Sequence, residues 1–232
     1  MPFFPFFYDP TFILLIPAML IAVYAQYKVK SAYNKYSKVK SSKGLSGADV
    51  SRKLLNSYDI DNVEVKKIEG NLTDHYDPVK KILNLSKDIY NSNSLAAIGI
   101  AAHETGHAIQ DAENYKAMSI RASLVPAANI GSSWGLPLAI FGFFLQSQFM
   151  IGLGFIVFLA AVLFHLVTLP VEFDASNRAI KLLARGNYLT DIELQGARKV
   201  LRAAAFTYVA ATLVAIANLL RILLLFGMGR DD

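Results

Sequence analysis

The sequence of 232 residues contains no cysteine. Disulfide bonds, thiol nucleophiles and metal sites made of thiolates are therefore excluded. Charged residues are also missing from three stretches, residues 10–27, 122–171 and 203–220, which are 18, 50 and 18 residues long. Because 54% of all residues are hydrophobic, these uncharged stretches exclude an ordinary soluble domain and indicate a membrane protein.

Four transmembrane helices are expected from the lengths of these stretches. A helix needs about 20 predominantly apolar residues to cross the hydrocarbon core of a bilayer. Residues 122–171 are therefore expected to hold two helices, and each shorter stretch is expected to hold one. We predict the turn between the two central helices at residues 145–148, where polar side chains interrupt the apolar sequence. Pro126 and Pro137 are tolerable inside the membrane, because neighbouring helices can satisfy the carbonyl groups that proline leaves free.

Basic residues are absent from the N-terminal flank, whereas a signal peptide would begin with them. This pattern favours a retained membrane anchor. Six lysines then follow between Lys28 and Lys43, with no acidic residue among them. Of the 23 Lys and Arg residues, 15 lie between Lys28 and Arg121 and 6 lie between Arg178 and Arg202. By the positive-inside rule both segments are predicted to face the cytoplasm, where anionic lipid headgroups rather than nucleic acid are the expected partners of the lysines.

The first of these cytoplasmic segments has the pattern of a small α+β region. Residues 28–43 are expected to continue the first helix or to form a linker. Ser46 and Asp49 have the spacing of a capping box, which predicts that a short amphipathic helix begins there. The sequences NVEVKKIEG and KKILNLS are predicted strands, and NLTDHYDPV between them is predicted to be a turn or an irregular loop.

The sequence HETGH, which begins at His103, carries the strongest chemical signal. It lies in SNSLAAIGIAAHETGHAIQD, a predicted helix with its N-cap at Asn93 or Ser94. On a helix His103 and His107 lie one turn apart on the same face, about 6 Å from each other, so that both imidazoles can point at one metal ion. Glu104 lies to the side, where it can reach a water on that ion more easily than the ion itself. This is the H-E-x-x-H pattern of zinc metalloproteases.

An alternative is that the two histidines lie on an exposed helix surface and bind nothing. The apolar sequence LAAIGIAA before the motif opposes this interpretation, because it predicts a buried helix. A catalytic zinc site also needs a third protein ligand and an open position. The extended motif with a third histidine downstream is missing, since Gln110 and Glu113 occupy those positions. The candidates for the third ligand are His75, Asp111, Glu113, His165, Glu172 and Asp174.

Glu172 is the favoured third ligand because it is the first charged residue after the 50-residue uncharged stretch. A chain that crosses the membrane twice after the HETGH helix returns Glu172 to the same membrane face. The alternative is a carboxylate in the first turn of a helix that starts after Pro170, where the helix dipole favours negative charge. Asp174 would face elsewhere on that helix and is expected to support the site without binding the ion.

The other candidates are expected to have smaller roles. His165 lies within the predicted third span, about 10 Å from Glu172 along a helix axis, and is expected to pack between helices. Asp111 lies one turn beyond His107 and is expected either to orient an imidazole or to form a solvated helix end.

The order of these motifs resembles a known family. An N-terminal anchor, LTDHYDP with LNLS, AAHETGHAIQ, two spans and LPVEFDASNRA follow one another as in the bacterial membrane-bound neutral zinc metallopeptidases, over nearly the whole chain. The layout is also similar to the gluzincin membrane proteases of the heat-shock and CAAX-prenyl types. The resemblance implies zinc held by His103, His107 and Glu172, with Glu104 as general base. Those relatives carry an Asp four residues after the glutamate ligand, a position that Ser176 occupies here.

The motif and the resemblance together predict a membrane-embedded zinc endopeptidase of the gluzincin type. Zinc would lower the pKa of a bound water and polarise the scissile carbonyl, and Glu104 would move the proton from that water to the leaving amine. His75, Tyr76 or Arg178 is expected to stabilise the oxyanion. Residues 80–86 are expected to pair with an extended peptide as a strand. The predicted partners are a peptide or membrane-protein substrate and the lipid bilayer, and no nucleic acid.

The predicted fold is mainly α, a multi-pass protein of the bacterial inner membrane with about four transmembrane helices and a small cytoplasmic α+β zincin-like portion. Its active site is predicted to face the cytoplasm. The predicted segments are an N-terminal transmembrane anchor (1–27), a cytoplasmic zincin-like region with the HETGH helix (28–121), a transmembrane hairpin (122–171), a cytoplasmic helix with the third zinc ligand (172–202) and a C-terminal transmembrane helix (203–232).

Other functions fit parts of the pattern. In intramembrane proteolysis the HETGH helix would itself lie in the bilayer, but only residues 94–102 precede the motif without charge. A zinc transporter would need several ionisable residues inside the spans, where only His165 and Arg221 qualify. A protein that binds zinc without catalysis is the remaining alternative. A peptidase site at the membrane–water interface is favoured over all three.

Overall fold

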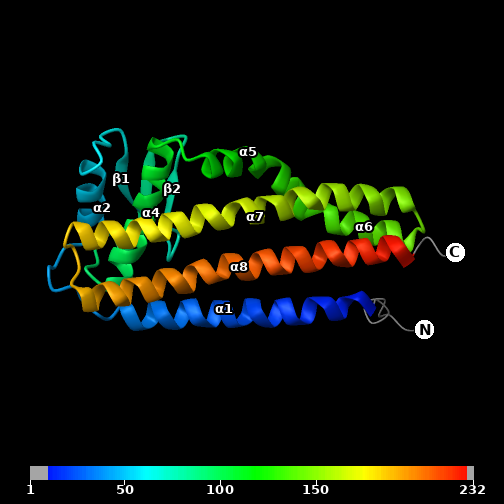
Figure 1. Cartoon of the computed structure of the whole chain (residues 1–232), viewed down its shortest axis with the longest axis horizontal. Helices are drawn as coiled ribbons and strands as arrows, with labels where there is room; N and C mark the ends of the chain where they lie inside the picture. Colours follow the sequence, from blue (N-terminus) through cyan, green and yellow to red (C-terminus); the bar gives the residue numbers. More distant parts are fainter. Residues whose placement is uncertain (1–9, 229–232) are drawn as a thin grey trace. The chain divides into compact units, whose positions relative to one another are not determined.

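The uncharged stretches form long helices in the structure, a computed structural model that describes residues 10–228. Residues 1–9, whose composition entered the anchor prediction, lie outside the described residues. Along the described chain (Figure 1) the elements are η2 (Pro10–Leu14), α1 (Leu15–Tyr36), α2 (Gly47–Asn56), β1 (Glu64–Ile68), β2 (His75–Asp77), β3 (Ile82–Ser86), α3 (Lys87–Tyr90), α4 (Leu95–Ala112), α5 (Lys116–Ile130), η3 (Gly131–Gly135), α6 (Leu136–Phe144), α7 (Gln148–Arg185) and α8 (Asp191–Met228). The fold is therefore mainly helical, with a small sheet.

The prediction of four helices that are long and apolar enough to cross a membrane is confirmed. Four helical segments of the described chain are long and apolar enough to cross a membrane: Thr11–Tyr36, Lys116–Phe144, Gln148–Arg185 and Asp191–Leu225. The turn between α6 and α7 falls at residues 145–147, within the predicted turn.

The helices continue beyond the uncharged stretches. α1 extends to Tyr36 and α7 extends to Arg185, because the residues after each uncharged stretch include no glycine or proline that would end the helix. Pro170 lies inside α7. The interpretation of Glu172 as a residue in the first turn of a helix is therefore wrong.

The second span is not one regular α-helix. A π-helical turn, η3, separates α5 from α6, and Pro137 lies in the first turn of α6. Pro137 therefore lies just after the π-helical turn, where the regular hydrogen-bond pattern of the helix is already interrupted. Pro126 lies inside α5, so both prolines are compatible with a helical span.

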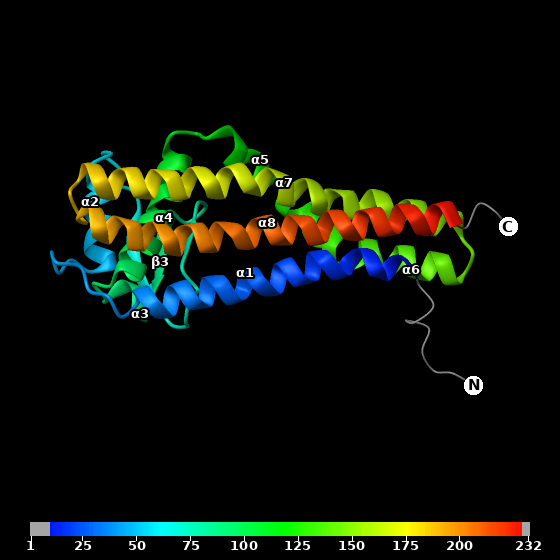
Figure 2. The same cartoon turned by 60° about the horizontal axis from the view of Figure 1, so that its bottom comes forward.

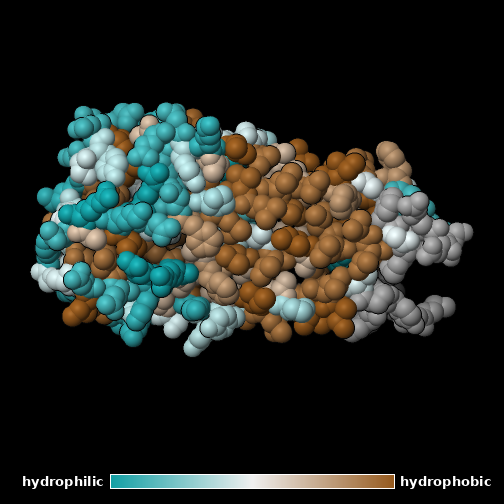
Figure 3. Space-filling model, in the orientation of Figure 1, coloured by the Kyte–Doolittle hydropathy of each residue, from teal (hydrophilic) through white to brown (hydrophobic). Residues whose placement is uncertain are grey.

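The chain divides into two compact units. The first unit contains Met1–Tyr24, Ile120–Leu169 and Tyr208–Asp232, and the second unit contains Ala25–Ser119 and Pro170–Thr207. The helices α1, α5, α7 and α8 contribute residues to both. Figure 3 shows hydrophobic colouring over the helices of the first unit and hydrophilic colouring over much of the second.

Apolar side chains both pack the first unit and cover its surface. A Cβ on Gly135 would lie 2.6 Å from the Cβ of Phe158, so glycine is needed where these two segments touch. Large apolar side chains such as Phe141 and Phe149, which are 63% and 77% exposed, point outward, as expected for residues that face lipid. The buried cluster of this unit consists of Ala139, Ile151, Phe158, Val162, Ala215 and Ile222.

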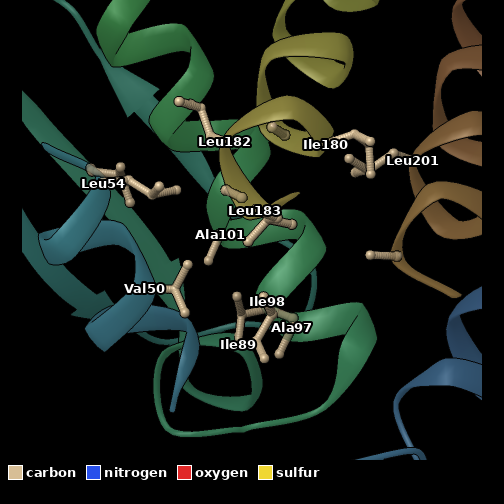
Figure 4. Packing of buried hydrophobic residues seen from close by; sticks show 14 of the residues in the cluster. Val50, Leu54, Ile89, Ala97, Ile98, Ala101, Ile180, Leu182, Leu183 and Leu201 are labelled. Carbon is tan, nitrogen blue, oxygen red and sulfur yellow. The ribbon is translucent and has the colours of Figure 1, made fainter. Parts of the chain in front are cut away.

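The second unit has a buried apolar core of its own. α2 begins at the predicted cap, where the hydroxyl of Ser46 accepts a hydrogen bond from the amide of Asp49 and the carboxylate of Asp49 accepts one from the amide of Ser46. This start places Val50 of α2 in one cluster with Ile98 of α4 and Leu183 of α7 (Figure 4). The predicted capping box is therefore confirmed.

A three-stranded sheet with the order β1-β3-β2 contacts α4 through β2 and β3 (Figure 2). β1 pairs in parallel with β3, and β2 pairs with it in antiparallel orientation. β1 and β3 match the two predicted strands, but β2 lies where a turn or an irregular loop was expected. Three residues are too few to show an alternating pattern. The strand is fixed instead by tertiary contacts, the pairing of His75 with Asn84 and the burial of Tyr76.

The central position of β3 overturns one functional prediction. Residues 80–86 were expected to pair with an extended peptide substrate. Because β3 pairs with β1 along one edge and, over Ile82–Asn84, with β2 along the other, it is a central strand and not an open edge strand for a peptide, and this prediction is wrong.

Candidate metal centre

The predicted HETGH helix is α4, and it begins at a predicted cap. The hydroxyl of Ser94 accepts a hydrogen bond from the amide of Ala97, and the helix runs to Ala112. Most of its side chains are buried. None of the candidate spans found in the described residues includes α4, which opposes intramembrane proteolysis by a spanning HETGH helix.

Gly106, the fourth residue of HETGH, allows α4 to approach α7 closely. A Cβ at this position would lie 2.8 Å from the carbonyl oxygen of Ala175, closer than real Cβ atoms come to other heavy atoms. Glycine is therefore the residue that fits between the two backbones. The same close approach brings Glu172, which precedes Ala175 by three residues on α7, to the face of α4 that carries the histidines.

Two imidazoles and one carboxylate meet at this helix contact. Oε2 of Glu172 lies 3.2 Å from Nε2 of His103 and 3.6 Å from Nε2 of His107. The two rings are 4.8 Å apart between centroids and nearly perpendicular. One ligand atom from each of the three side chains lies within 4.8 Å of the others, so the three can bind a single ion. The structure thus brings together all three residues that were predicted as zinc ligands.

The chemistry of this donor set fits zinc. Catalytic zinc sites use three protein ligands drawn from imidazole nitrogens and carboxylate oxygens, which are the groups gathered here. Glu172 is only 2% exposed and His107 only 7%. A buried carboxylate is stable only when it is paired or binds a cation. The site therefore has both the ligands and the negative charge that a divalent ion needs.

The charge of the cluster acts on His107. Burial alone would lower the pKa of this imidazole, but its hydrogen bond to Glu172 and the negative charges of Glu104 and Glu172 raise the pKa above its ordinary value. A position that favours an extra positive charge on an imidazole also favours a metal cation. Protons and metal are therefore expected to compete for His107.

Gln110 fixes the orientation of His107. Its amide nitrogen donates to the carbonyl of Val171 at 2.9 Å and to Oδ2 of Asp174 at 2.8 Å. The amide oxygen therefore faces Nδ1 of His107, at 2.9 Å, and can only accept. Nδ1 must carry the proton, which leaves the lone pair of Nε2 free for a metal ion.

Ser176 has the corresponding place beside His103. Its hydroxyl oxygen lies 3.2 Å from Nδ1 of His103. A hydroxyl that accepts from Nδ1 again leaves Nε2 as the metal-binding atom. Ser176 occupies the position, four residues after Glu172, where the resemblance led us to look for an Asp. The serine therefore contacts a histidine of the cluster from that position.

Asp174 reaches the metal centre indirectly, through Gln110. It accepts a hydrogen bond from Nε of Arg178 at 2.5 Å, and Nη1 of Arg178 donates to Glu113 at 2.6 Å. The guanidinium also lies over the ring of Tyr115. Asp174 therefore connects Gln110 to a charged surface network and does not contact either histidine, in keeping with its predicted supporting role.

Asp111 does not have either of the roles that were considered for it. Its Oδ2 accepts hydrogen bonds from the hydroxyl of Tyr76 at 2.6 Å and from Nζ of Lys81 at 2.5 Å. It therefore neither orients an imidazole nor ends the helix in solvent, but ties α4 to the sheet. Burial and the neighbouring carboxylate of Asp111 raise the pKa of Tyr76.

The remaining predicted residues lie apart from the three-residue cluster. His75 is exposed on β2, with Nδ1 2.8 Å from the carbonyl of Thr73 and Nε2 3.2 Å from Asn84. His165 belongs to the first unit and contacts the ring of Phe164. Among the described residues, the group of side chains that could hold a metal ion contains His103, His107 and Glu172, and neither His75 nor His165.

Sequence reasoning missed three polar residues around the cluster. Gln110 was noted only as the absence of a third histidine, although its offset of three residues from His107 on a helix was a usable signal. Ser176 was noted only as a departure from a family pattern. Asp74 gave no sequence signal. Burial raises its pKa, with a smaller contribution from the charge of Glu104, against hydrogen bonds from Ser86.

The chain is similar to known proteins along almost its whole length. The model of a family described as "Putative neutral zinc metallopeptidase" matches residues 11–227. The chain is 44% identical over 219 residues to a protein of Bacillus subtilis (strain 168) named "Putative membrane protease YugP", and this match covers 94% of the chain and 97% of that protein. No solved structure matches the chain.

Proposed function

The chain belongs to the zinc metallopeptidase family whose model matches residues 11–227, and we propose that it is an endopeptidase that hydrolyses peptide bonds at the cytoplasmic face of the membrane. One observation carries the proposal. His103, His107 and Glu172 gather at a contact between two helices, next to a glutamate of the H-E-x-x-H pattern. The pattern supplies two ligands and a base, and the helix contact supplies the third ligand.

His103, His107 and Glu172 would hold the zinc ion, through Nε2 of each imidazole and the carboxylate. A zinc ion in such a site supplies Lewis acidity and a water that loses its proton near neutral pH. The protein side chains do the rest. Gln110 and Ser176 hold the two imidazoles in the orientation that presents Nε2.

Glu104 is the proposed general base. It follows His103 directly on α4, so its carboxylate points about 100° away around the helix and lies outside the ligand set. From there it accepts the proton of the attacking water and delivers it to the leaving amine, which are two transfers by one carboxylate.

Arg178 is the best proposal among the three predicted oxyanion donors. The hydroxyl of Tyr76 is already donated to Asp111, and both ring nitrogens of His75 have partners. A guanidinium has five N–H groups. The hydrogen bonds of Arg178 to Asp174 and Glu113 use only Nε and Nη1, so Nη2 keeps donors for a substrate oxygen.

The edge of β2 is the proposed place for the substrate backbone. β2 pairs with β3 on one side only and contacts α4, whereas β3 lies between β1 and β2. An extended peptide that adds to this edge would gain backbone hydrogen bonds without a specific sequence. The predicted substrates, unfolded peptides and membrane proteins, have such extended segments.

The distribution of basic residues supports a cytoplasmic site. Twenty of the 23 Lys and Arg residues, all except Arg121, Arg221 and Arg230, belong to the second unit. The positive-inside rule therefore assigns that unit to the cytoplasm.

Labelling of single cysteines in this cysteine-free chain tests the orientation. Ser42 lies between α1 and α2, before the metal-centre residues in the sequence, and Leu145 lies in the turn of the predicted transmembrane hairpin. Both residues are exposed. In intact cells an impermeant thiol reagent should label Leu145→Cys and leave Ser42→Cys unlabelled until the cells are opened. Labelling of Ser42→Cys from outside would place the metal centre on the external face.

Removal of the base tests catalysis. Glu104→Gln should keep zinc and fold but lose peptide hydrolysis by roughly 10²- to 10⁴-fold. Glu69→Gln makes the same chemical change at an exposed position in a loop and should cleave like the wild type. Equal cleavage by Glu104→Gln and the wild type, with zinc bound in both, would leave a zinc-binding protein without catalysis as the better description.

A further inference from the structure

A pocket of about 290 Å³ lies between α7 and α8, and Ser176, which contacts His103, is one of its lining residues. All its lining residues belong to the second unit. Lys181 of α7 and Arg198 and Arg202 of α8 bring three positive charges to the wall, and no lining residue is acidic. The pocket is therefore strongly cationic.

In the part of the chain that the structure describes, these three cations form no ion pair. Among the residues that the structure describes, no ion pair joins Lys181, Arg198 or Arg202 to a carboxylate. One acidic residue, Asp191, lines a neighbouring pocket together with both arginines. It forms no ion pair with either of them. Three unpaired cations around one pocket predict an anionic occupant.

The two ends of the pocket differ in polarity. Phe173 and Ala205 line one end. Phe173 follows the last residue of the uncharged stretch of α7, Val171, by two positions, and Ala205 lies within the uncharged stretch of α8, which begins at Ala203. Leu201 adds further apolar surface. The cations follow in the direction away from the uncharged stretches. The pocket is thus amphiphilic along the helix axes.

The position of the arginines matches the headgroup layer of a bilayer. Arg202 and Arg198 precede Ala203 by one and five residues, which is about 1.5 and 7.5 Å along a helix. The headgroup region on each side of the hydrocarbon core is roughly 5–8 Å thick. The backbone positions of both arginines therefore lie at the level of the lipid phosphates.

We propose that this pocket binds the headgroup of an anionic phospholipid. Arg198, Arg202 and Lys181 hold the phosphate, which guanidinium groups bind through paired N–H donors. The glycerol and the first part of an acyl chain lie against Phe173 and Ala205. An acidic peptide would neutralise the same cations but would leave the apolar end, beside the uncharged stretches, without a partner. The proposal does not depend on the peptidase activity.

The pocket also reaches the metal centre. Ser176 lines it, and the same hydroxyl lies 3.2 Å from Nδ1 of His103. A lipid in the pocket would therefore touch a residue that orients a zinc ligand.

The test is a lipid titration of the full-length protein in a neutral detergent, read by native mass spectrometry. Wild type should bind phosphatidylglycerol more tightly than phosphatidylcholine. The triple variant Lys181→Gln, Arg198→Gln, Arg202→Gln should lose affinity for phosphatidylglycerol by roughly 100-fold, at about fivefold for each cation near a lipid surface. Circular dichroism and zinc content should be unchanged, which shows that the variant is folded.

A matched control removes the same charge elsewhere. Lys87, Arg185 and Lys199 are exposed and do not line the pocket. The triple variant Lys87→Gln, Arg185→Gln, Lys199→Gln should keep most of the affinity. Equal losses in the two triple variants would show a general effect of surface charge and overturn the site.

Other ligands and one neutral variant complete the test. Ala205→Trp fills the apolar end while all cations remain, and it should also weaken lipid binding, which keeps the proposal testable if the triple variant misfolds.

Glycerol 3-phosphate, which lacks acyl chains, should bind more weakly than the lipid. Equal binding of glycerol 3-phosphate would show a site for small anions, and displacement of lipid by an acidic peptide at equal concentration would show a peptide site. Either result, or equal affinity for phosphatidylcholine, would overturn the proposal.

Discussion

The two units of the molecule bury polar side chains in different ways. In the first unit the hydroxyls of Thr168 and Thr212 donate to carbonyl groups one turn earlier in their own helices. In the second unit Thr105 makes the same kind of bond within α4, but Gln110 also donates from α4 to the carbonyl of Val171 in α7, and Ser176 of α7 contacts His103 of α4. Polar contacts within one helix satisfy a buried group but do not position one helix against another. The contacts between α4 and α7 do both, and the candidate metal centre is built from them.

The helix contacts of both units nevertheless depend on glycine. Gly135 in the first unit and Gly106 in the second each leave no room for a Cβ. Close backbone contact is a general way to pack helices in a membrane. In the second unit the close contact at glycine also assembles the candidate metal centre, because it brings a carboxylate from one helix to two imidazoles of another. The predictions below separate the packing effect from the chemical one.

The largest effect is expected from Gly106→Ala. The added Cβ meets the backbone of α7 at 2.8 Å, so the helices must move apart. Unfolding free energy should fall by about 1–3 kcal/mol, as is typical of overpacking, and zinc should be lost because Glu172 moves with α7. Gly135→Ala is the matched variant in the first unit. It should cost similar stability and keep zinc, as measured by thermal unfolding and by metal analysis of the purified proteins.

A smaller effect is expected from Gln110→Ala. The variant removes the group that orients His107 and leaves the carbonyl of Val171 without this donor, so zinc affinity should fall by about 10- to 100-fold. Thr168→Val in the first unit removes a hydrogen bond within one helix and should change stability by less than about 1.5 kcal/mol. Its zinc affinity should equal that of the wild type. A competition titration with a zinc chelator measures both, and equal affinities in the two variants would remove the distinction between the units.

Helix caps give the next comparison. Ser46→Ala removes the capping box of α2 and should lower the stability of the protein by about 1 kcal/mol. Ser147→Ala removes a longer contact, 3.4 Å to the amide of Met150, and should have less effect. Denaturant or thermal unfolding in detergent checks the order, which a larger loss in Ser147→Ala would contradict.

The smallest effect depends on pH. Hydrogen bonds from the side chain and backbone of Ser46 lower the pKa of Asp49 below its ordinary value of 3.8. A group whose pKa is lowered on folding stabilises the protein above the unfolded pKa, and this contribution disappears as the pH falls through the folded pKa. Asp49→Asn should therefore be less stable than the wild type at neutral pH, and the difference should vanish in acid below that folded pKa. A difference that grows in acid would contradict the assignment.

Local patterns carried most of what the sequence could predict. The spacing of His103, Glu104 and His107 determines their positions on a helix whatever the rest of the chain does. The capping box at Ser46 and the four long apolar helices are local in the same sense. Glu172 is the exception, since it was predicted from the return of the chain after two spans, and the structure brings it to the histidines.

Long-range contacts account for what the sequence did not predict. β2 forms by pairing with β3, which places His75 opposite Asn84. β3 is the central strand because it pairs with β1 on one side and with β2 on the other. From its spacing along α4, Asp111 was expected either to orient an imidazole or to form a solvated helix end, but Tyr76 of β2 and Lys81, which directly precedes β3, donate to its carboxylate. No spacing in a single helix reports which strand will lie beside it.

Glu172 is the proposed ligand that α7 contributes beside the histidines of α4, and metal analysis of two isosteric variants tests this role most directly. Glu172→Gln and Asp174→Asn each replace a carboxylate by an amide of nearly the same shape, two residues apart on one helix. The purified wild type and Asp174→Asn should each contain about one zinc per chain, because Asp174 reaches the site only through Gln110. Glu172→Gln should contain far less than one. Equal zinc in Glu172→Gln and the wild type would contradict the assignment, and with it the view that the helix contact builds the site.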